Sequence, residues 1–168
     1  AETATMDPVE ALTLDKVDSN DMRVLSLNVQ RDALFDPERQ PAFIRMLRAI
    51  NPDIIGFQEI YNHTAEEAKA VVEQAIPSSD DVVWHAAKAG SELIVVSRYP
   101  VLASAPIPAR PSSDPNAAHL LDTEAVLGKP LLFLNAHPPC CANNEPRQRD
   151  MDAMMAFVRD AKAGEGTI

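Results

Sequence analysis

Residues 53–59 read Asp53-Ile54-Ile55-Gly56-Phe57-Gln58-Glu59, an apolar run that ends abruptly in a carboxylate. Upstream, Arg23-Val24-Leu25-Ser26-Leu27-Asn28-Val29 is a second apolar run, punctuated by an amide. Downstream, Leu131-Leu132-Phe133-Leu134-Asn135-Ala136-His137 is a third run, which ends in an imidazole. Short apolar runs of this kind are typical of buried strands. Acceptor oxygens and a titratable ring at the ends of buried strands predict a metal site at the edge of a sheet.

Strand and helix patterns alternate around these runs. Two strand–helix–strand passages followed by hairpin-linked strands predict a mixed α/β chain. Gly128-Lys129-Pro130 is the predicted hairpin turn, and the proline-rich residues 106–116 are predicted to form a rigid extended loop. The strands are expected at residues 22–29, 53–58, 82–87, 92–98, 101–105, 118–127 and 131–137.

Helix signals lie between the predicted strands. The first helix is expected to have Asp36 as its N-cap and Pro37 at its first position, and Asn51-Pro52 ends it. The second opens with Thr64-Ala65-Glu66-Glu67, a capping box. The third begins after Asn143-Asn144. The residues expected on one face of the third helix are Met151, Met154, Met155 and Val158.

Composition and charge restrict the class of protein. A chain of 168 residues with 46% hydrophobic residues is sufficient for one folded domain. No apolar run approaches the roughly 20 residues that span a bilayer. The net charge of −10, from 15 basic and 25 acidic residues, disfavours bulk non-specific DNA binding, which depends on Lys and Arg neutralising phosphates. The net charge does not exclude a small phosphate ester that binds in a pocket containing a cation.

Residues 1–21 are acidic and lack periodicity. We expect them to form a flexible or surface-wrapped leader. The sequence starts at Ala1 and shows no apolar core of a signal peptide, which suggests a trimmed or processed product. The cellular compartment stays open, with export slightly favoured over the cytoplasm.

Glu59 and Asn28 are the candidate metal ligands. A carboxylate at the end of a buried strand needs a partner, and Mg²⁺ typically takes one or two carboxylates together with waters and substrate phosphate. A solvated Glu59, or one paired with an arginine, is the alternative. Asn28 is unusual in an apolar strand, although an edge or bulge position would also explain it. Asn135 and His137 are two residues apart, so a strand places their side chains on one face.

The order Leu27-Asn28-Val29, Pro52-Asp53-Ile54-Ile55-x-x-Gln58-Glu59, Ser97-Arg98-Tyr99-Pro100 and Asn135-x-His137 resembles the endonuclease/exonuclease/phosphatase superfamily, with its DNase I-like fold. The resemblance runs from about Met22 to the end of the sequence. It implies a four-layer α-β-β-α sandwich and metal-assisted hydrolysis of a phosphate ester.

The resemblance also implies roles for single residues. It places Glu59 and Asn28 at a Mg²⁺ site, with Mn²⁺ as a possible substitute, and His137 beside the scissile phosphate. Glu92 stands eight residues before Pro100, as does a glutamate of the pancreatic-type branch that hydrogen-bonds the active-site histidine. We therefore predict His137, Asn135 and Glu92 as catalytic residues and Glu59 and Asn28 as metal ligands. Arg98 either neutralises a phosphate oxygen or is structural.

Family members continue into later segments ending Gly-Asp-x-Asn and Ser-Asp-His, and neither motif occurs here. Residues 22–168 are therefore expected to be the N-terminal portion of such a domain, with the C-terminal portion absent. The predicted function is a portion of a Mg²⁺-dependent phosphoesterase that is weak or inactive alone and self-associates through an uncovered sheet face. The alternative is a catalytically silent binding or scaffold domain of the same fold.

Cys140 and Cys141 are adjacent and lack the C-x-x-C spacing of zinc or redox sites. We expect two thiols in a loop, with a bridge to a cysteine outside this sequence, or redox sensitivity, as alternatives. A thiol-redox function would need a low-pKa thiol, which no neighbouring motif supports. We interpret the remaining histidines as surface or packing residues: His63, His85 and His119.

Overall fold

The apolar run 53–59 forms β2 (Ile54–Gln58), a fully buried strand in the computed structural model. The structure describes Leu14 and residues 16–18, 21–80, 82–107, 116–139 and 144–164. Among these residues no helix combines the length and apolar character needed to cross a membrane. The further elements are β1 (Val24–Asn28), η1 (Ala33–Phe35), α1 (Gln40–Ile50), α2 (Ala65–Ala75), β3 (His85–Ala89), β4 (Leu93–Ser97), β5 (Val101–Ile107), β6 (Asn116–Leu121), α3 (Glu124–Leu127), β7 (Leu131–Asn135) and α4 (Glu145–Ala163).

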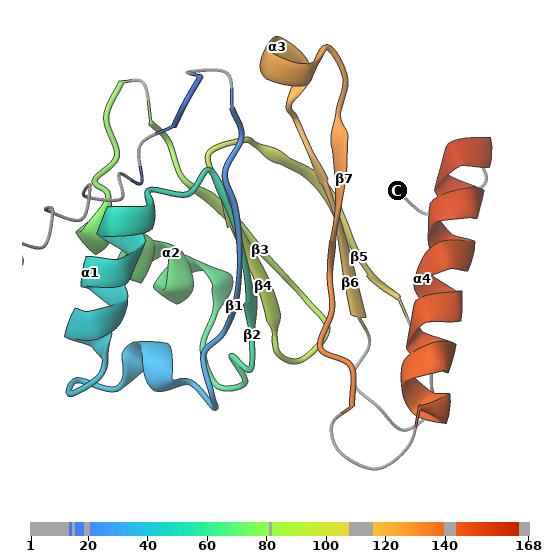
Figure 1. Ribbon diagram of the computed structural model, residues 1–168, viewed down its shortest axis with the longest axis horizontal. Helices are drawn as coiled ribbons and strands as arrows, with labels where there is room; N and C mark the ends of the chain where they lie inside the picture. Colours follow the sequence, from blue (N-terminus) through green and yellow to red (C-terminus); the bar gives the residue numbers. More distant parts are fainter. Residues whose placement is uncertain are drawn as a thin grey trace, which may run out of the picture.

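The strands form two sheets that face each other. The first has the order β1-β2-β4-β3, with β1 and β2 parallel and the other pairs antiparallel. The second has the antiparallel order β5-β6-β7. Helices α1 and α2 cover the outer face of the first sheet, and α4 covers the outer face of the second (Figure 1). The layers are therefore helix, sheet, sheet and helix.

The alternation of side chains along β2 divides the core between these layers. Ile55 and Phe57 pack with Leu47 of α1 and Val72 of α2, whereas Ile54 faces the second sheet and packs with Val95 and Leu121. Because both faces of this central strand are covered, its sequence is a continuous apolar run rather than an alternating one. In the first sheet, the edge strand β1 is partly open to solvent. Its residues are exposed at alternate positions, and Val24 is 51% exposed.

Helix α1 starts later than predicted. Asp36 is extended rather than an N-cap, its Oδ1 accepts the Glu38 amide at 2.8 Å, and its carbonyl accepts the Gln40 amide at 2.8 Å. These bonds close a turn, so that Pro41 rather than Pro37 lies in the first turn of the helix. The capping box of α2 is confirmed: Thr64 and Glu67 exchange side-chain and backbone hydrogen bonds. The Thr64 amide is the main cause of the lowering of the Glu67 pKa to about 2.

The strand predicted over 118–127 is wrong in its second half. Strand β6 ends at Leu121, and residues 124–127 form the short helix α3. Thr123 Oγ1 donates to the Lys129 carbonyl at 2.7 Å, and the Thr123 carbonyl accepts the Val126 and Leu127 amides. Such local bonds compete with strand pairing. Gly128, with a left-handed φ of 68°, is the C-cap of α3. The strand expected at 82–87 lies at 85–89 instead.

The buried face of α4 differs from the predicted methionine stripe. Met151 and Met155 are 51% and 50% exposed, whereas Met154 is buried and packs with Ile107 and Ala118 of the second sheet. The helix is therefore rotated relative to the prediction, and Ala153 and Phe157 join Met154 on the packed side. Both stripes have helical spacing, so the sequence alone did not distinguish them.

Candidate functional site

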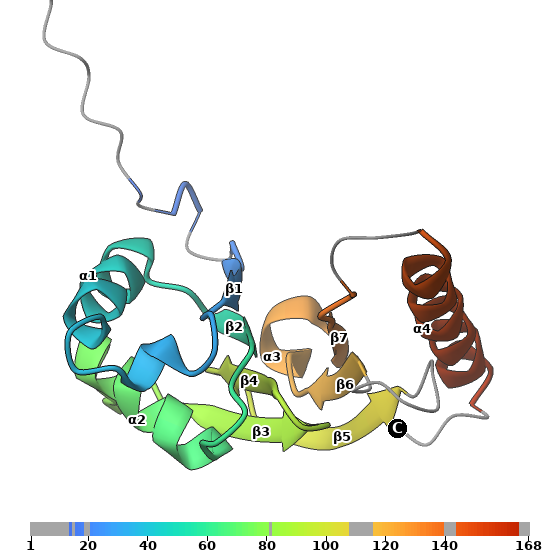
Figure 2. The same ribbon diagram turned by 90° about the horizontal axis from the view of Figure 1, so that it is seen from below.

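Three polar side chains from different strands meet at one end of the sandwich. Asn28 is the last residue of β1, Glu59 follows β2 directly, and His137 lies two residues beyond the end of β7. The loops that follow these three strands gather at the lower end of the molecule in Figure 1, the end that Figure 2 views from below. The contacts between these side chains confirm the predicted proximity of Asn28, Glu59 and His137.

Asn28 bridges the carboxylate and the imidazole. Its Nδ2 donates to Glu59 Oε1 at 2.8 Å and lies 3.3 Å from His137 Nε2. The distance between His137 Nε2 and Glu59 Oε1 is 3.5 Å. Since Asn28 Oδ1 accepts the Gln30 amide at 2.8 Å, the amide orientation with nitrogen toward the other two side chains satisfies every polar atom of Asn28.

Glu92 holds the opposite side of the imidazole. Its Oε1 lies 2.9 Å from His137 Nδ1, and its side chain is only 5% exposed. A carboxylate accepts but does not donate, so Nδ1 carries the hydrogen and Nε2 of the neutral ring is left to accept from Asn28. The structure thus brings together the predicted Glu92 and His137, and the contacts select the Nδ1–H tautomer.

Backbone strain is concentrated in the same place. Within the described residues, the non-glycine positions with positive φ are Gln30, Arg31, Asp32, Asn51 and Glu59. Four of them adjoin the polar cluster, and such left-handed residues cost free energy that the surroundings must offset. Two hydrogen bonds from backbone amides contribute to this, because the Arg31 amide donates to Glu59 Oε2 at 2.9 Å and the Asp32 amide donates to the Glu59 carbonyl at 2.9 Å.

Asn135 does not join this cluster. It is buried between the sheets, where its Oδ1 accepts from Gln58 Nε2 at 2.7 Å and its Nδ2 donates to the carbonyls of Phe57 and Ile94. All of these bonds cross from the second sheet to the first. The observed contacts give Asn135 a bridging role, and the predicted catalytic role stays a prediction. A β-carbon on Gly56 would lie 3.2 Å from Asn135 Oδ1, which explains the glycine in β2.

The donor set fits a hard divalent cation with few protein ligands. The Glu59 side chain is 19% exposed. Its Oε1 accepts from the Asn28 side-chain amide, and its Oε2 accepts from the Arg31 backbone amide, so the carboxylate is held in place. Among the described residues there is no group of three or more His, Cys, Asp or Glu side chains in metal-binding proximity. A zinc site needs such a group, whereas Mg²⁺ is held by one or two carboxylates with water and phosphate. Glu59 and Asn28 stay the predicted metal ligands, although Asn28 Oδ1 accepts the Gln30 amide in this structure.

Two residues close to the site were not predicted. Asp32 and Lys88 both bind the backbone of the loop that follows Glu59. Lys88 is the lone Lys, Arg, Asp or Glu in His85-Ala86-Ala87-Lys88-Ala89, and a lysine in a half-buried strand is a signal that could have identified it. No sequence signal marks Asp32, because its role follows from the left-handed backbone of the preceding residues.

The other candidates lie away from the cluster. Arg98 is structural: its guanidinium lies 5.3 Å from the Trp84 ring centre and pairs with Asp53 at 3.4 Å. Asp53 also pairs at 2.7 Å with Lys16, which belongs to the predicted leader. Most of residues 1–21, and Cys140 and Cys141, lie outside the described residues. His63 stacks on Phe35 with ring centres 3.7 Å apart.

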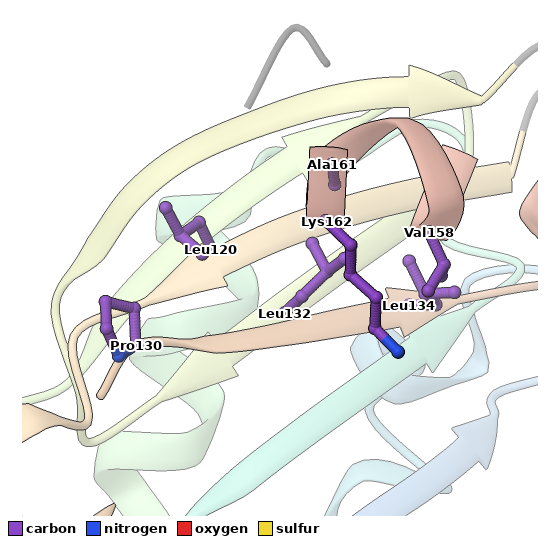
Figure 3. A pocket seen from close by; sticks show the side chains of 7 residues that line it. All are labelled: Leu120, Pro130, Leu132, Leu134, Val158, Ala161 and Lys162. Carbon is purple, nitrogen blue, oxygen red and sulfur yellow. The ribbon is translucent and has the colours of Figure 1, made fainter. Parts of the chain in front are cut away.

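An apolar cavity of about 370 Å³ lies between the second sheet and the C-terminal half of α4 (Figure 3). Leu132 and Leu134 of β7 face Val158 and Ala161 of α4 across it, and Lys162 extends along its side. None of its lining residues belongs to the polar cluster. The cavity is therefore separate from the candidate site.

Comparisons with known proteins agree with the geometry. Residues 25–168 match the model of the Endonuclease/Exonuclease/phosphatase family. The chain is similar to an endonuclease/exonuclease/phosphatase family protein from Leptotrichia buccalis C-1013-b, at 17% identity and a TM-score of 0.55 over 81% of this chain. It is also similar to D. rerio TDP2 complexed with single strand DNA product, at 17% identity and a TM-score of 0.58 over 83% of this chain. A search of curated proteins found no significant match.

The two solved structures are longer than this sequence. The similarity covers 62% of the Leptotrichia buccalis chain and 55% of the D. rerio chain. At 17% identity the likeness shows the fold, and function depends on the site itself.

Proposed function

The chain belongs to the endonuclease/exonuclease/phosphatase family, and on that premise we propose that it carries part of the active site of a Mg²⁺-dependent phosphoesterase. The reaction would be hydrolysis of a phosphodiester or phosphomonoester by attack of water. Enzymes of this family generally use divalent metals such as Mg²⁺. The observation that supports the proposal best is the continuous line of contacts from Glu59 through Asn28 and His137 to Glu92.

Each residue of this line has a distinct proposed role. Glu59 would bind the cation, and Asn28 would hold the Glu59 carboxylate and orient the imidazole through one amide group. A bound divalent cation stabilises negative charge on phosphoryl oxygens. His137, with Nε2 free of a proton in the neutral ring, can accept a proton at that atom and return it to a leaving oxygen. Glu92 would keep the ring in this tautomer and stabilise it when it is protonated.

The substrate class is restricted by charge but stays open. With a net charge of −10, binding of bulk duplex DNA is disfavoured. A small phosphate ester, a lipid phosphodiester and the end of a nucleic-acid strand all present a single phosphate to the cluster. The D. rerio structure contains single strand DNA product, so a short single-stranded oligonucleotide is one substrate to test beside the small esters.

Metal binding is the first experiment. Mn²⁺ binding, followed by electron paramagnetic resonance, should occur in the micromolar to millimolar range and should weaken at least about tenfold in Glu59→Gln. Glu124→Gln is the matched control, because Glu124 is exposed on α3, at the opposite end of the molecule from the loops that carry the cluster (Figure 1). Equal Mn²⁺ affinity in Glu59→Gln and the wild type would contradict the proposal.

Hydrolysis is the second experiment. We propose that the 168 residues alone turn over bis(4-nitrophenyl) phosphate slowly, because the described residues offer one carboxylate to the ion. Slow, Mn²⁺-dependent turnover that is lost in Glu59→Gln and His137→Ala would support the phosphoesterase. Binding of Mn²⁺ and of the ester with no turnover under any condition would instead favour the silent binding domain of the same fold.

Self-association is part of the same proposal. Val24 on β1 is 51% exposed, and the cavity beside β7 is lined mainly by apolar side chains. Apolar side chains left open at these two places are the proposed basis of association, since exposed apolar surface can drive it. Light scattering should therefore give a mass above that of the 18.3 kDa monomer, and a clean monomer at all concentrations would count against it.

A further inference from the structure

The segment Glu59–His63 carries the metal-binding carboxylate of the proposed function at its first residue. Glu59 has a φ of 66°, a left-handed conformation that a glutamate does not favour. The segment follows β2 directly and leads into the capping box of α2 at Thr64. Its backbone therefore has to be held from outside by other parts of the chain, and two charged side chains do this.

Lys88 binds one side of the segment through its carbonyl groups. The ammonium donates to the carbonyl oxygens of Ile60 at 2.9 Å, Tyr61 at 3.2 Å and His63 at 2.9 Å. A lysine ammonium has three N–H donors, so these bonds use all of them. Burial lowers the pKa of Lys88, and the charges of Asp32, Glu67 and Glu92 act against that lowering.

Asp32 binds the same segment through its N–H groups. One carboxylate oxygen accepts the Tyr61 amide at 2.7 Å, and the other accepts Asn62 Nδ2 at 2.7 Å, with the Asn62 amide at 3.3 Å. Asp32 is also tied to Glu59 by its own amide, which donates to the Glu59 carbonyl at 2.9 Å. Carbonyls bound by a cation and amides bound by an anion hold the peptide groups of the segment in one orientation.

The segment connects both carboxylates of the candidate site. Glu59 begins it, and the Ile60 amide donates to the carbonyl of Glu92 at 3.1 Å. A change in the backbone at Ile60 would therefore shift both Glu59 and Glu92. Glu59 contacts Asn28, and Glu92 contacts His137. Within the described part of the chain, neither Lys88 nor Asp32 hydrogen-bonds the Glu59 carboxylate, so their influence on it passes through this backbone.

We propose that Lys88 and Asp32 are positioning residues that hold the segment Glu59–His63, and through it the Glu59 carboxylate, in the geometry that binds a divalent cation. The inference rests on the proposed function for its metal readout, and it has a second readout that does not. The second readout is the backbone conformation of Glu59 in the metal-free protein.

The test compares Lys88→Met and Asp32→Asn with the wild type in two measurements. Asparagine is chosen at position 32 because it tolerates the left-handed backbone. In each variant, the Cα and Cβ chemical shifts of Glu59 should move away from their wild-type, left-handed values. Mn²⁺ affinity should fall by about tenfold or more, as for removal of residues that orient metal ligands. The matched controls are Lys129→Met and Asp80→Asn, both exposed and remote from the segment.

The outcomes separate this inference from the proposed function. Wild-type chemical shifts and Mn²⁺ affinity within twofold of wild type in both variants would overturn the inference. If the wild type shows no Glu59-dependent Mn²⁺ binding, the proposed function fails, and the chemical shifts still decide whether Lys88 and Asp32 hold Glu59. If Lys88→Met does not fold, Asp32→Asn decides alone, because its carboxylate bonds lie at the surface.

Discussion

Glu92 Oε1 and His137 Nδ1 are 2.9 Å apart, although the two residues are separated by 45 positions in the sequence. The other ring nitrogen lies 3.3 Å from Asn28 Nδ2. An acceptor on one side of the ring and a donor on the other select a single neutral tautomer. This arrangement leads to the first prediction.

Glu92→Leu should remove the preference for the Nδ1–H tautomer, because leucine offers no acceptor to Nδ1. Glu92→Gln is the matched control, since its amide oxygen can still accept that hydrogen. Long-range ¹H–¹⁵N correlation spectra of the His137 ring above pH 8 distinguish the tautomers. Retention of the Nδ1–H form in Glu92→Leu would show that Glu92 does not set the state of the ring. In any hydrolysis assay that shows turnover, Glu92→Leu should be slower by about tenfold or more.

Asn135→Ala should destabilise the fold. The change removes the 2.7 Å acceptor of the buried Gln58 Nε2, which keeps its bond to the Gly56 carbonyl, and it removes the hydrogen bonds that the Phe57 and Ile94 carbonyls accept from Asn135 Nδ2. Leaving buried polar groups unsatisfied costs about 1–3 kcal/mol each, so a loss of roughly 2–4 kcal/mol is expected in urea denaturation. Asn144→Ala, at an exposed N-cap with no side-chain cap bond, should change stability by less than about 0.5 kcal/mol. Similar values for the two variants would refute the bridging role of Asn135.

Gly56→Ala tests how closely the two sheets approach at β2. A β-carbon at this position would lie 3.0 Å from Phe133 Cζ and 3.2 Å from Asn135 Oδ1. Overpacking of this kind typically costs about 1–3 kcal/mol. Combining Gly56→Ala with Phe133→Leu should cost less than the sum of the single changes, because the smaller side chain makes room. Additive costs in the denaturation experiments would mean that the ring is not what opposes a side chain at position 56.

Strand ends gave the most reliable predictions. Asn28, Glu59 and His137 stand where apolar runs end. The strand predicted over 131–137 ends at Asn135, however, and Asn135 bonds between the sheets while His137 joins the cluster. The family and the mixed α/β fold that these runs suggested are confirmed. A two-residue period of apolar side chains and an abrupt change of polarity are local signals, so they can be recognised without knowledge of the tertiary contacts.

The remaining errors concern features that local patterns do not contain. The rotation of α4 depends on which helical stripe meets Ile107 and Ala118, and the turn after Leu121 depends on the bond between Thr123 and Lys129. Asp32 and Lys88 act on backbone atoms of a distant segment. Side chains that bind backbone leave no partner residue to recognise in the sequence, so only the fold reveals them.

His119 predicts how stability depends on pH. Its ring is fully buried, Nδ1 lies 2.8 Å from Ser104 Oγ, and Nε2 has no hydrogen-bond partner among the described residues. Burial lowers the pKa of His119 from 6.5 to about 4. Between these two values the unfolded chain binds a proton that the folded chain does not, so the folded state loses stability as the pH falls from about 6.5 toward 4.

His119→Leu should remove this loss. From pH 7 to pH 4.5 the His119 contribution falls by about 2 kcal/mol, so the wild type should lose about that much more stability than His119→Leu over this range. Carboxylates common to both proteins, including Glu67 with its pKa near 2, cancel in the difference. Ser104→Ala retains the buried imidazole and should keep the wild-type dependence. Urea denaturation of the three proteins at pH 7, 6, 5 and 4.5 measures the effect, and parallel stability curves for the wild type and His119→Leu would show that His119 is not kept neutral by burial.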